Sequence, residues 1–132
     1  MLNKQRVLEE LNKFADQHQI KKPDIQVLGG ASLVIRGLRE VAADIDLYVC
    51  KETCLRLLET GAFESRLVKE KPEIIWLTSE LIDIRDTAYE CDMTVEGFHI
   101  QSLKSVLGLK LRLNRDKDQA DILNIQKTLN LL

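Results

Sequence analysis

The chain has 132 residues and a formal net charge of −2, with 45% hydrophobic and 30% charged residues, a composition typical of a globular domain with one core. This charge argues against a protein that coats nucleic acid, and no apolar run approaches the length of a membrane span. The N-terminus is polar and helical in pattern, unlike a signal peptide, so we expect a cytoplasmic protein.

Apolar residues at helical spacing predict an amphipathic helix over residues 3–19. After a break, residues 25–28 are short and apolar enough for a first strand, and residues 31–36 are expected to form a short helix. Residues 44–49 are predicted to be a second strand. A helix over residues 52–60 should follow it and end at a glycine.

Two glycines, Gly29 and Gly30, stand between the first predicted strand and the helix that follows. Because they lack side chains, they allow the backbone to turn sharply and to bring N–H groups close to an anion. The positive end of the next helix should point to the same place. The pattern therefore favours a phosphate-binding turn.

Asp44 and Asp46 are two residues apart on the second predicted strand. Both carboxylates should project from one face of the sheet, while Ile45 and Leu47 project from the other. Adjacent carboxylates repel each other unless a cation lies between them. The expected cation is Mg²⁺, because this hard ion prefers carboxylate and phosphate oxygens.

From residue 63 to residue 86 the hydrophobic period becomes that of strands, and we expect antiparallel strands that extend the sheet. The strand-like runs lie at Phe63 and at residues 66–68, 74–77 and 81–84. In the last run Asp83 alternates with Ile82 and Ile84, so its carboxylate should face away from theirs. The alternative is a solvent-facing acid. Residues 87–97 are acidic and irregular in pattern, before a short apolar segment.

Ser102 is a plausible N-cap for a helix in which Lys110 lies on the same stripe as Leu103 and Leu107. A lysine among apolar neighbours must extend its amino group outward or meet an anion, either a nucleotide phosphate or an active-site carboxylate. A last helix follows residues 115–118. Acids favour its N-terminus, and Lys117 is placed to pair with Asp121.

The order of these features resembles the nucleotidyltransferase superfamily, which includes DNA polymerase beta, the tRNA CCA-adding enzymes and the lincosamide nucleotidyltransferases. Its pattern is an apolar residue, Gly-Gly or Gly-Ser, a spacer and Asp-apolar-Asp, which residues 28–30 and 44–46 match. Gly37 and Arg39 fit the Gly-x-Arg of small bacterial transferases and toxin-antitoxin components, whereas Ala42 stands where a Thr is usual. Residues 110–122 resemble the C-terminal signature of the lincosamide group.

The resemblance implies a minimal nucleotidyltransferase fold of the α/β (α+β) class, with a mixed sheet flanked by helices. One domain would span residues 1–132, with its core at about 25–101 and two C-terminal helices at about 102–132. The implied activity is Mg²⁺- or Mn²⁺-dependent transfer of a nucleoside monophosphate from a nucleoside triphosphate, such as ATP, to a hydroxyl acceptor. That acceptor could be an RNA end, a protein or a small molecule.

The resemblance also implies roles for individual residues. Asp83 would be the third metal-binding carboxylate and the proton acceptor, with Asp86 as its substitute. The residues expected to bind metal and to be catalytic are Asp44, Asp46 and Asp83. The residues expected to bind the nucleotide are Gly29, Gly30, Ser32, Arg39 and Lys110.

Two further expectations concern the open side of the site. Since a separate substrate domain does not fit within 132 residues, we expect a second copy of the chain, another protein or the acceptor to close it. Surface leucines of the C-terminal helices, Leu111, Leu131 and Leu132, are the expected contact, with a homodimer favoured. The alternative function is a catalytically weak or inactive binding protein of this fold, such as an antitoxin or scaffold, which Ala42 and the missing substrate domain favour.

Overall fold

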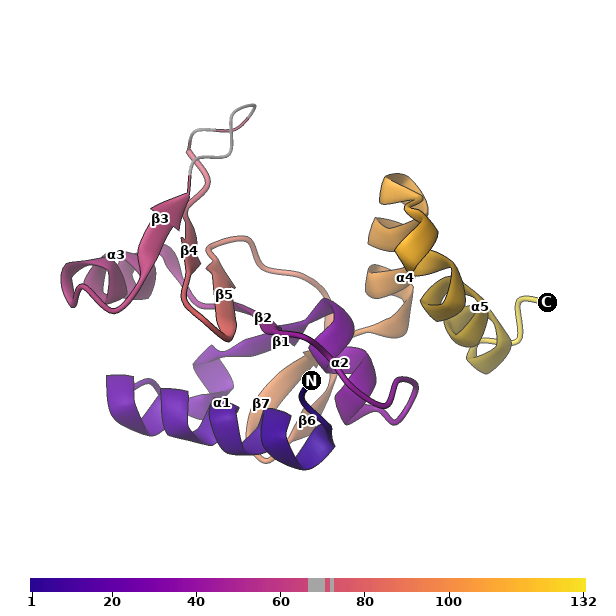
Figure 1. Ribbon diagram of the computed structural model, residues 1–132, viewed down its shortest axis with the longest axis horizontal. Helices are drawn as coiled ribbons and strands as arrows, with labels where there is room; N and C mark the ends of the chain where they lie inside the picture. Colours follow the sequence, from indigo (N-terminus) through magenta and orange to yellow (C-terminus); the bar gives the residue numbers. More distant parts are fainter. Residues whose placement is uncertain (67–70, 72) are drawn as a thin grey trace.

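The computed structural model describes residues 1–66, 71 and 73–132 (Figure 1). Within these residues, five α-helices and two short 3-10 helices accompany a seven-stranded mixed sheet, which agrees with the predicted mixed α and β class. Positions 67 and 68 of the predicted run 66–68 lie outside the described residues.

The sheet has the strand order β3-β4-β5-β2-β1-β7-β6. Its strands are β1 (Gln26–Leu28), β2 (Ile45–Tyr48), β3 (Glu64–Arg66), β4 (Trp76–Thr78), β5 (Ile82–Arg85), β6 (Cys91–Val95) and β7 (Phe98–Gln101). Two pairs are parallel, β2 with β5 and β1 with β7, and the other four are antiparallel. The expectation that the later strands are all antiparallel is therefore wrong for β5. The chain reverses at β4 before β5 adds to β2.

The α-helices are α1 (Lys4–His18), α2 (Gly29–Ile35), α3 (Lys51–Glu59), α4 (Leu103–Leu113) and α5 (Gln119–Thr128), with 3-10 helices η1 (Lys22–Asp24) and η2 (Asp116–Asp118). The predicted N-cap of α4 is confirmed, because the Ser102 side chain accepts a hydrogen bond from the backbone N–H of Ser105. In Figure 1, β3 and β4 lie toward one end of the molecule and the α4–α5 pair lies at the other.

Two expected boundaries are corrected. α2 begins at Gly29, so both glycines belong to its first turn rather than to a loop before it. Gly29 has a φ of +53°, a left-handed conformation that glycine adopts without a steric penalty. Part of the segment predicted to be irregular forms β6, an edge strand that pairs with β7. Its burial pattern is mostly exposed, so it lacks the apolar alternation that would have identified it.

One face of the sheet carries the larger apolar cluster. Ile45 and Leu47 of β2 and Ile84 of β5 are fully buried there. The helical members of this cluster include Val7, Leu11 and Phe14 of α1, Ala31, Val34 and Ile35 of α2, and Cys54 and Leu57 of α3. Since alternate strand residues point to opposite faces, the polar residues of β2 and β5 point away from these helices.

A smaller apolar cluster holds the C-terminal helices against α2. Leu33 of α2 packs there with Leu103, Val106, Leu107, Ile122 and Ile125. α2 therefore contributes to both clusters, because Val34 and Ile35 belong to the larger one.

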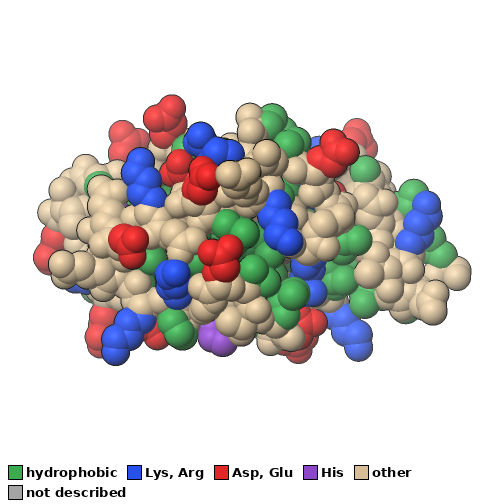
Figure 2. Space-filling view, turned by 90° about the horizontal axis from the view of Figure 1, so that it is seen from below, with side chains coloured by type: hydrophobic (Ala, Val, Ile, Leu, Met, Phe, Trp, Pro, Cys, Tyr) green, Lys and Arg blue, Asp and Glu red, His purple; other side chains and the backbone are tan. Residues whose placement is uncertain are grey.

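Several leucines of the C-terminal helices remain on the surface, with Leu111 48%, Leu131 60% and Leu132 74% exposed. Figure 2 shows one side of the molecule, on which acidic and basic side chains are interspersed and apolar side chains lie between them. In the described part of the chain, no helix combines the length and apolar character that a membrane span requires.

Candidate functional site

Three carboxylates meet on the face of the sheet that points away from the larger cluster. Asp46 of β2 and Asp83 of β5 lie directly opposite each other in the parallel pair. Asp44 lies two residues before Asp46, and one oxygen from each of the three carboxylates lies within 4.8 Å of the other two. The expected substitute for Asp83 is not in this group, because Asp86 Oδ1 accepts the backbone N–H of Ile75 at 3.0 Å.

The carboxylates are electrostatically crowded. Burial, and then repulsion by Asp44, raises the pKa of Asp46 to about 6, although Arg85 opposes the shift. Burial and the charge of Asp83 also raise the pKa of Asp44. Asp83 is held in place by Thr78, whose hydroxyl donates to Asp83 Oδ1 at 2.6 Å. A bound cation would relieve this repulsion, since it interacts favourably with every carboxylate.

The carboxylates line a cavity of about 450 Å³, a size in the usual range for small-molecule sites. Its walls come from the glycine turn, from the polar face of the sheet and from α4 and η2. The lining residues that carry charge or lie at the turn are Gly29, Gly30, Arg39, Asp44, Asp46, Asp83, Arg85, Lys110, Arg115, Lys117 and Asp118, and Trp76 also lines the cavity.

The glycine turn approaches both the carboxylates and Arg39 closely. A Cβ on Gly29 would lie 3.4 Å from Asp46 Oδ2, and one on Gly30 would lie 3.0 Å from Arg39 Nη1. The backbone N–H of Gly29 donates to Gln101 Oε1 at 2.9 Å. Gln101 thus fixes the turn from β7, which the sequence did not reveal, because the turn and Gln101 are 72 positions apart.

Ser32 does not have the position expected of a nucleotide ligand. Its side chain is fully buried, and its hydroxyl donates to the carbonyl oxygen of Gly29 at 2.5 Å. Ser32 is not among the residues that line the cavity. Its hydroxyl therefore supports the turn from within instead of facing a ligand.

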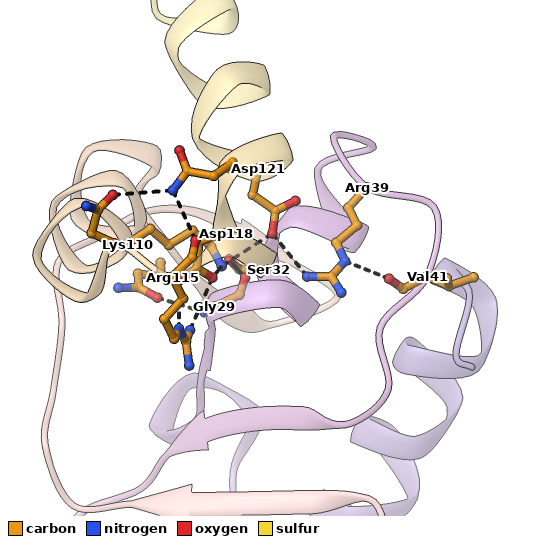
Figure 3. Close-up of polar contacts among 11 residues, drawn as sticks. Gly29, Ser32, Arg39, Val41, Lys110, Arg115, Asp118 and Asp121 are labelled. Carbon is orange, nitrogen blue, oxygen red and sulfur yellow. Dashed lines mark hydrogen bonds and ion pairs between the residues drawn. The ribbon is translucent and has the colours of Figure 1, made fainter.

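Arg39 and Lys110 reach the cavity, but both contact acids of the C-terminal region (Figure 3). Arg39 Nη1 lies 3.1 Å from Asp121 Oδ2, and Arg39 Nε donates to the carbonyl oxygen of Val41 at 2.8 Å. Lys110 Nζ lies 3.0 Å from Asp118 Oδ1 and 3.3 Å from Asp121 Oδ2.

The anion that Lys110 meets is therefore the carboxylate pair of η2 and α5. Among the described residues, Asp121 pairs with Arg39 and Lys110 and not with Lys117 as expected. Asp118 accepts two further hydrogen bonds from Arg115, at 2.7 and 3.1 Å. These bonds, and those from Lys110, lower the pKa of Asp118 to about 2.

Compared with protein-family models and with curated proteins, the chain has no match in either set. The site is thus defined by its own geometry. Three carboxylates supply only oxygen donors, the type that Mg²⁺ and Mn²⁺ prefer, and basic side chains and a glycine turn lie beside them. This arrangement can bind a cation together with a phosphorylated ligand.

Proposed function

We propose that the protein is a metal-dependent nucleotidyltransferase that moves a nucleoside monophosphate from a nucleoside triphosphate to a hydroxyl acceptor. The observation that carries the proposal is the meeting of Asp44, Asp46 and Asp83, whose ligand oxygens lie within 4.8 Å of one another beside the glycine turn. The same residues carry the resemblance to the nucleotidyltransferase superfamily, including its small bacterial members.

The residues present fit Mg²⁺ or Mn²⁺. All three donors are carboxylates, and burial, followed by repulsion from Asp44, raises the pKa of Asp46, a repulsion that a divalent cation would relieve. When bound, a pair of such ions supplies charge stabilisation for the entering and leaving oxygens of a displacement at phosphorus. Asp44, Asp46 and Asp83 would hold the metal, with Asp83 as the ligand nearest the acceptor.

The chain's own residues have separate tasks in this reaction. Arg39 is the candidate partner for the triphosphate, because it lines the cavity and the missing side chain of Gly30 lets its guanidinium lie against the glycine turn. Lys110 is paired with Asp118 and Asp121, so its charge would attract the triphosphate from a distance without contacting it directly.

The proposed reaction is a displacement at the α-phosphorus. The acceptor oxygen forms a bond to the α-phosphorus, the bond from that phosphorus to the β-phosphate oxygen breaks, and pyrophosphate leaves. In this proposal Asp83 would take the acceptor proton, and its position on the strand farther from the glycine turn supports that role.

A second candidate function is nucleotide binding without turnover, as in an antitoxin or scaffold. The specific observation that favours it is the pairing of both Arg39 and Lys110 with acids of the same chain. Triphosphate binding would have to compete with these contacts. The buried Ala42, where related small transferases have a Thr, points in the same direction.

Incubation with each α-labelled nucleoside triphosphate, Mg²⁺ or Mn²⁺ and cell extract tests the proposal. Metal-dependent transfer of label to RNA, protein or a small molecule is expected, and Asp46→Asn should abolish it. Asp16→Asn, a change of the same kind at an exposed position on α1, is the control. Saturable nucleotide binding with no transfer to any fraction would support the second candidate. If the protein neither transfers label nor binds any nucleotide, both candidate functions are refuted.

A further inference from the structure

A second row of side chains crosses the polar face of the sheet beside the carboxylates. Arg66 of β3 lies opposite Trp76 of β4, and Trp76 lies opposite Arg85 of β5. Directly opposed residues share a face of the sheet. Since Arg85 is two residues beyond Asp83, this face is the one that carries the three carboxylates.

The members of this row contact one another through the indole ring. The guanidinium carbon of Arg66 lies 5.5 Å from the centroid of the Trp76 ring, and that of Arg85 lies 5.1 Å from it. Both distances are those of cation–π contacts. Within residues 1–66, 71 and 73–132, neither arginine forms an ion pair with an acid. Neither guanidinium is thus held by an acid in an ion pair among these residues, although the charge of Arg85 also acts on Asp44 and Asp46.

The indole nitrogen is a further sign of a missing partner. Trp76 Nε1 is buried and has no acceptor among the described residues. A buried donor without an acceptor is unfavourable by about 1–3 kcal/mol, so such groups are rare in proteins. A ligand with an oxygen or ring nitrogen at this position would supply the acceptor.

The row also has a suitable position relative to the carboxylates. Trp76 and Arg85 line the same cavity as Asp46 and Asp83. In the sheet, β4 lies beyond β5 on the side away from β1, and β1 leads into the glycine turn. Residues two apart on a strand are about 7 Å apart, so in the sheet the row of Trp76 lies about that far from Asp46 and Asp83, with Asp44 on the side of Asp46 away from the row.

We propose that Arg66, Trp76 and Arg85 form the acceptor subsite and that the acceptor is a nucleotide with a free sugar hydroxyl. The inference rests on the proposed function and adds the substrate class to it. A base would stack on the indole or on a guanidinium plane, and a phosphate would pair with the arginines. The sugar hydroxyl, several ångströms from the base, would then reach the carboxylates from the side opposite the triphosphate.

The chemistry of the row favours a nucleotide over a tyrosine or serine of a protein. Two cations that form no ion pair within the described part of the chain lie beside one aromatic ring, and they fit a ligand that is both aromatic and anionic. A phenol or alkyl hydroxyl has no phosphate for the arginines. The nucleotide could be the terminal residue of a single-stranded RNA or a free nucleoside monophosphate, and both present the same groups.

Trp76 is the only tryptophan in the chain, so its fluorescence reports on this subsite directly. The titration uses AMP, a short single-stranded oligoribonucleotide and a tyrosine-containing peptide, without metal or triphosphate. Saturable quenching by AMP or RNA is expected. Much tighter quenching by RNA than by AMP would identify an RNA end, and equal affinities would identify a mononucleotide.

Arg66→Gln should weaken nucleotide binding about tenfold and, for RNA, reduce the slope of log affinity against log salt by about 0.7. Arg6→Gln on α1, an exposed arginine distant from the cavity, is the matched control and should change neither. Both positions are exposed, and circular dichroism would verify that both variants fold.

These outcomes separate the subsite from the proposed activity. Quenching by AMP or RNA without any label transfer would support the subsite and count against the enzyme. Transfer to a non-nucleotide acceptor that Arg66→Gln leaves unchanged would overturn the subsite and leave the enzyme intact. Quenching by the peptide alone would also overturn the subsite. Quenching by a metal–triphosphate complex that displaces RNA would overturn it as well, because Trp76 would then belong to the triphosphate site.

Discussion

Arg39 Nη1 lies 3.1 Å from Asp121 Oδ2, although 82 positions separate the two residues in the chain. The pair joins the loop after α2 to the first turn of α5 at the edge of the cavity. If Arg39 binds a triphosphate, its guanidinium must exchange one anion for another. Asp121 would then compete with the ligand in addition to its structural contact with Arg39.

Asp121→Asn should lower the dissociation constant for a nucleoside triphosphate several-fold, because it removes a negative charge from the site. Lys110 keeps its contact with Asp118, so the loss of stability should be limited to about 1–3 kcal/mol. Calorimetric titration and denaturant unfolding would measure the two effects. Weaker triphosphate binding in this variant would indicate that Asp121 orients Arg39 for the ligand.

Asp46→Asn should stabilise the metal-free protein at pH 8. The pKa of Asp46 is raised to about 6 in the folded state, so folding favours the protonated carboxyl over the carboxylate. The wild-type protein therefore has its full stability below the ordinary pKa of an aspartate and loses part of it as the pH rises through about 6, whereas the Asn variant does not. The gain at pH 8 should approach about 3 kcal/mol, from the shift of about two pKa units, and should fade near pH 4.

The same variant should lose stabilisation by metal. Wild-type protein should gain about 2.7 kcal/mol at a hundredfold excess of Mn²⁺ over its dissociation constant, and Asp46→Asn should gain none. Thermal melting with and without Mn²⁺ measures this. Equal responses of the variant and the wild type would exclude Asp46 as a ligand.

Substitutions of three glycines should separate backbone strain from loss of the site. Gly29→Ala and Gly37→Ala both place a side chain at positive φ, which costs roughly 1–2 kcal/mol. Of these two glycines, Gly29 alone is near a candidate site residue, since a Cβ on Gly37 meets nothing within 4 Å. Gly30→Ala should displace Arg39 without such strain. We expect similar melting temperatures for the Gly29 and Gly37 variants, and weaker nucleotide binding only for the Gly29 and Gly30 variants.

Asp118 should contribute to stability in a pH-dependent way. Its folded-state pKa of about 2 lies below the ordinary value, so its contribution is present above about pH 4 and is lost as pH falls toward 2. Asp118→Asn should therefore lower the free energy of unfolding by about 2 kcal/mol at pH 6, and the difference should shrink below pH 4. Urea unfolding at both pH values would show it. A difference independent of pH would assign the effect to packing.

The exposed leucines predict self-association through the C-terminal helices. Leu111 is 48% exposed on α4, and Leu55 is 46% exposed on α3. If α4 and α5 form the interface of a homodimer, Leu111→Glu should dissociate it, whereas Leu55→Glu should not. Light scattering at micromolar concentration measures the mass. A strict monomer in the wild type would leave closure of the cavity to another protein or to the acceptor.

The convergence of the carboxylates could be predicted because it depends on local alternation. Asp46 and Asp83 each stand between core residues, so their faces were fixed by the burial of Ile45, Leu47, Ile82 and Ile84. Asp86 has the same chemistry, but its role as an acceptor for the Ile75 N–H depends on how the chain returns to β5. Asp83 therefore joins the carboxylate cluster and Asp86 does not.

What the sequence did not provide were contacts between distant segments. The apolar neighbours of Lys110 predict that its amino group either extends outward or meets an anion, and the choice between them follows from the packing of η2 against α4. Ser32 has the right residue type beside the glycines, yet the early start of α2 turns its hydroxyl inward. β6 was missed because an exposed edge strand has little apolar pattern to detect.

The position of α2 in both apolar clusters joins the two halves of the molecule in unfolding. Leu33 packs with the C-terminal helices, while Ala31 and Val34 pack with the sheet. Gln101 binds the N–H of Gly29 and also donates to Ser105 of α4. Detachment of α4 and α5 would expose Leu33 and loosen the acceptor of the Gly29 amide. The glycine turn should therefore exchange its amide hydrogen on the same timescale as the C-terminal helices open.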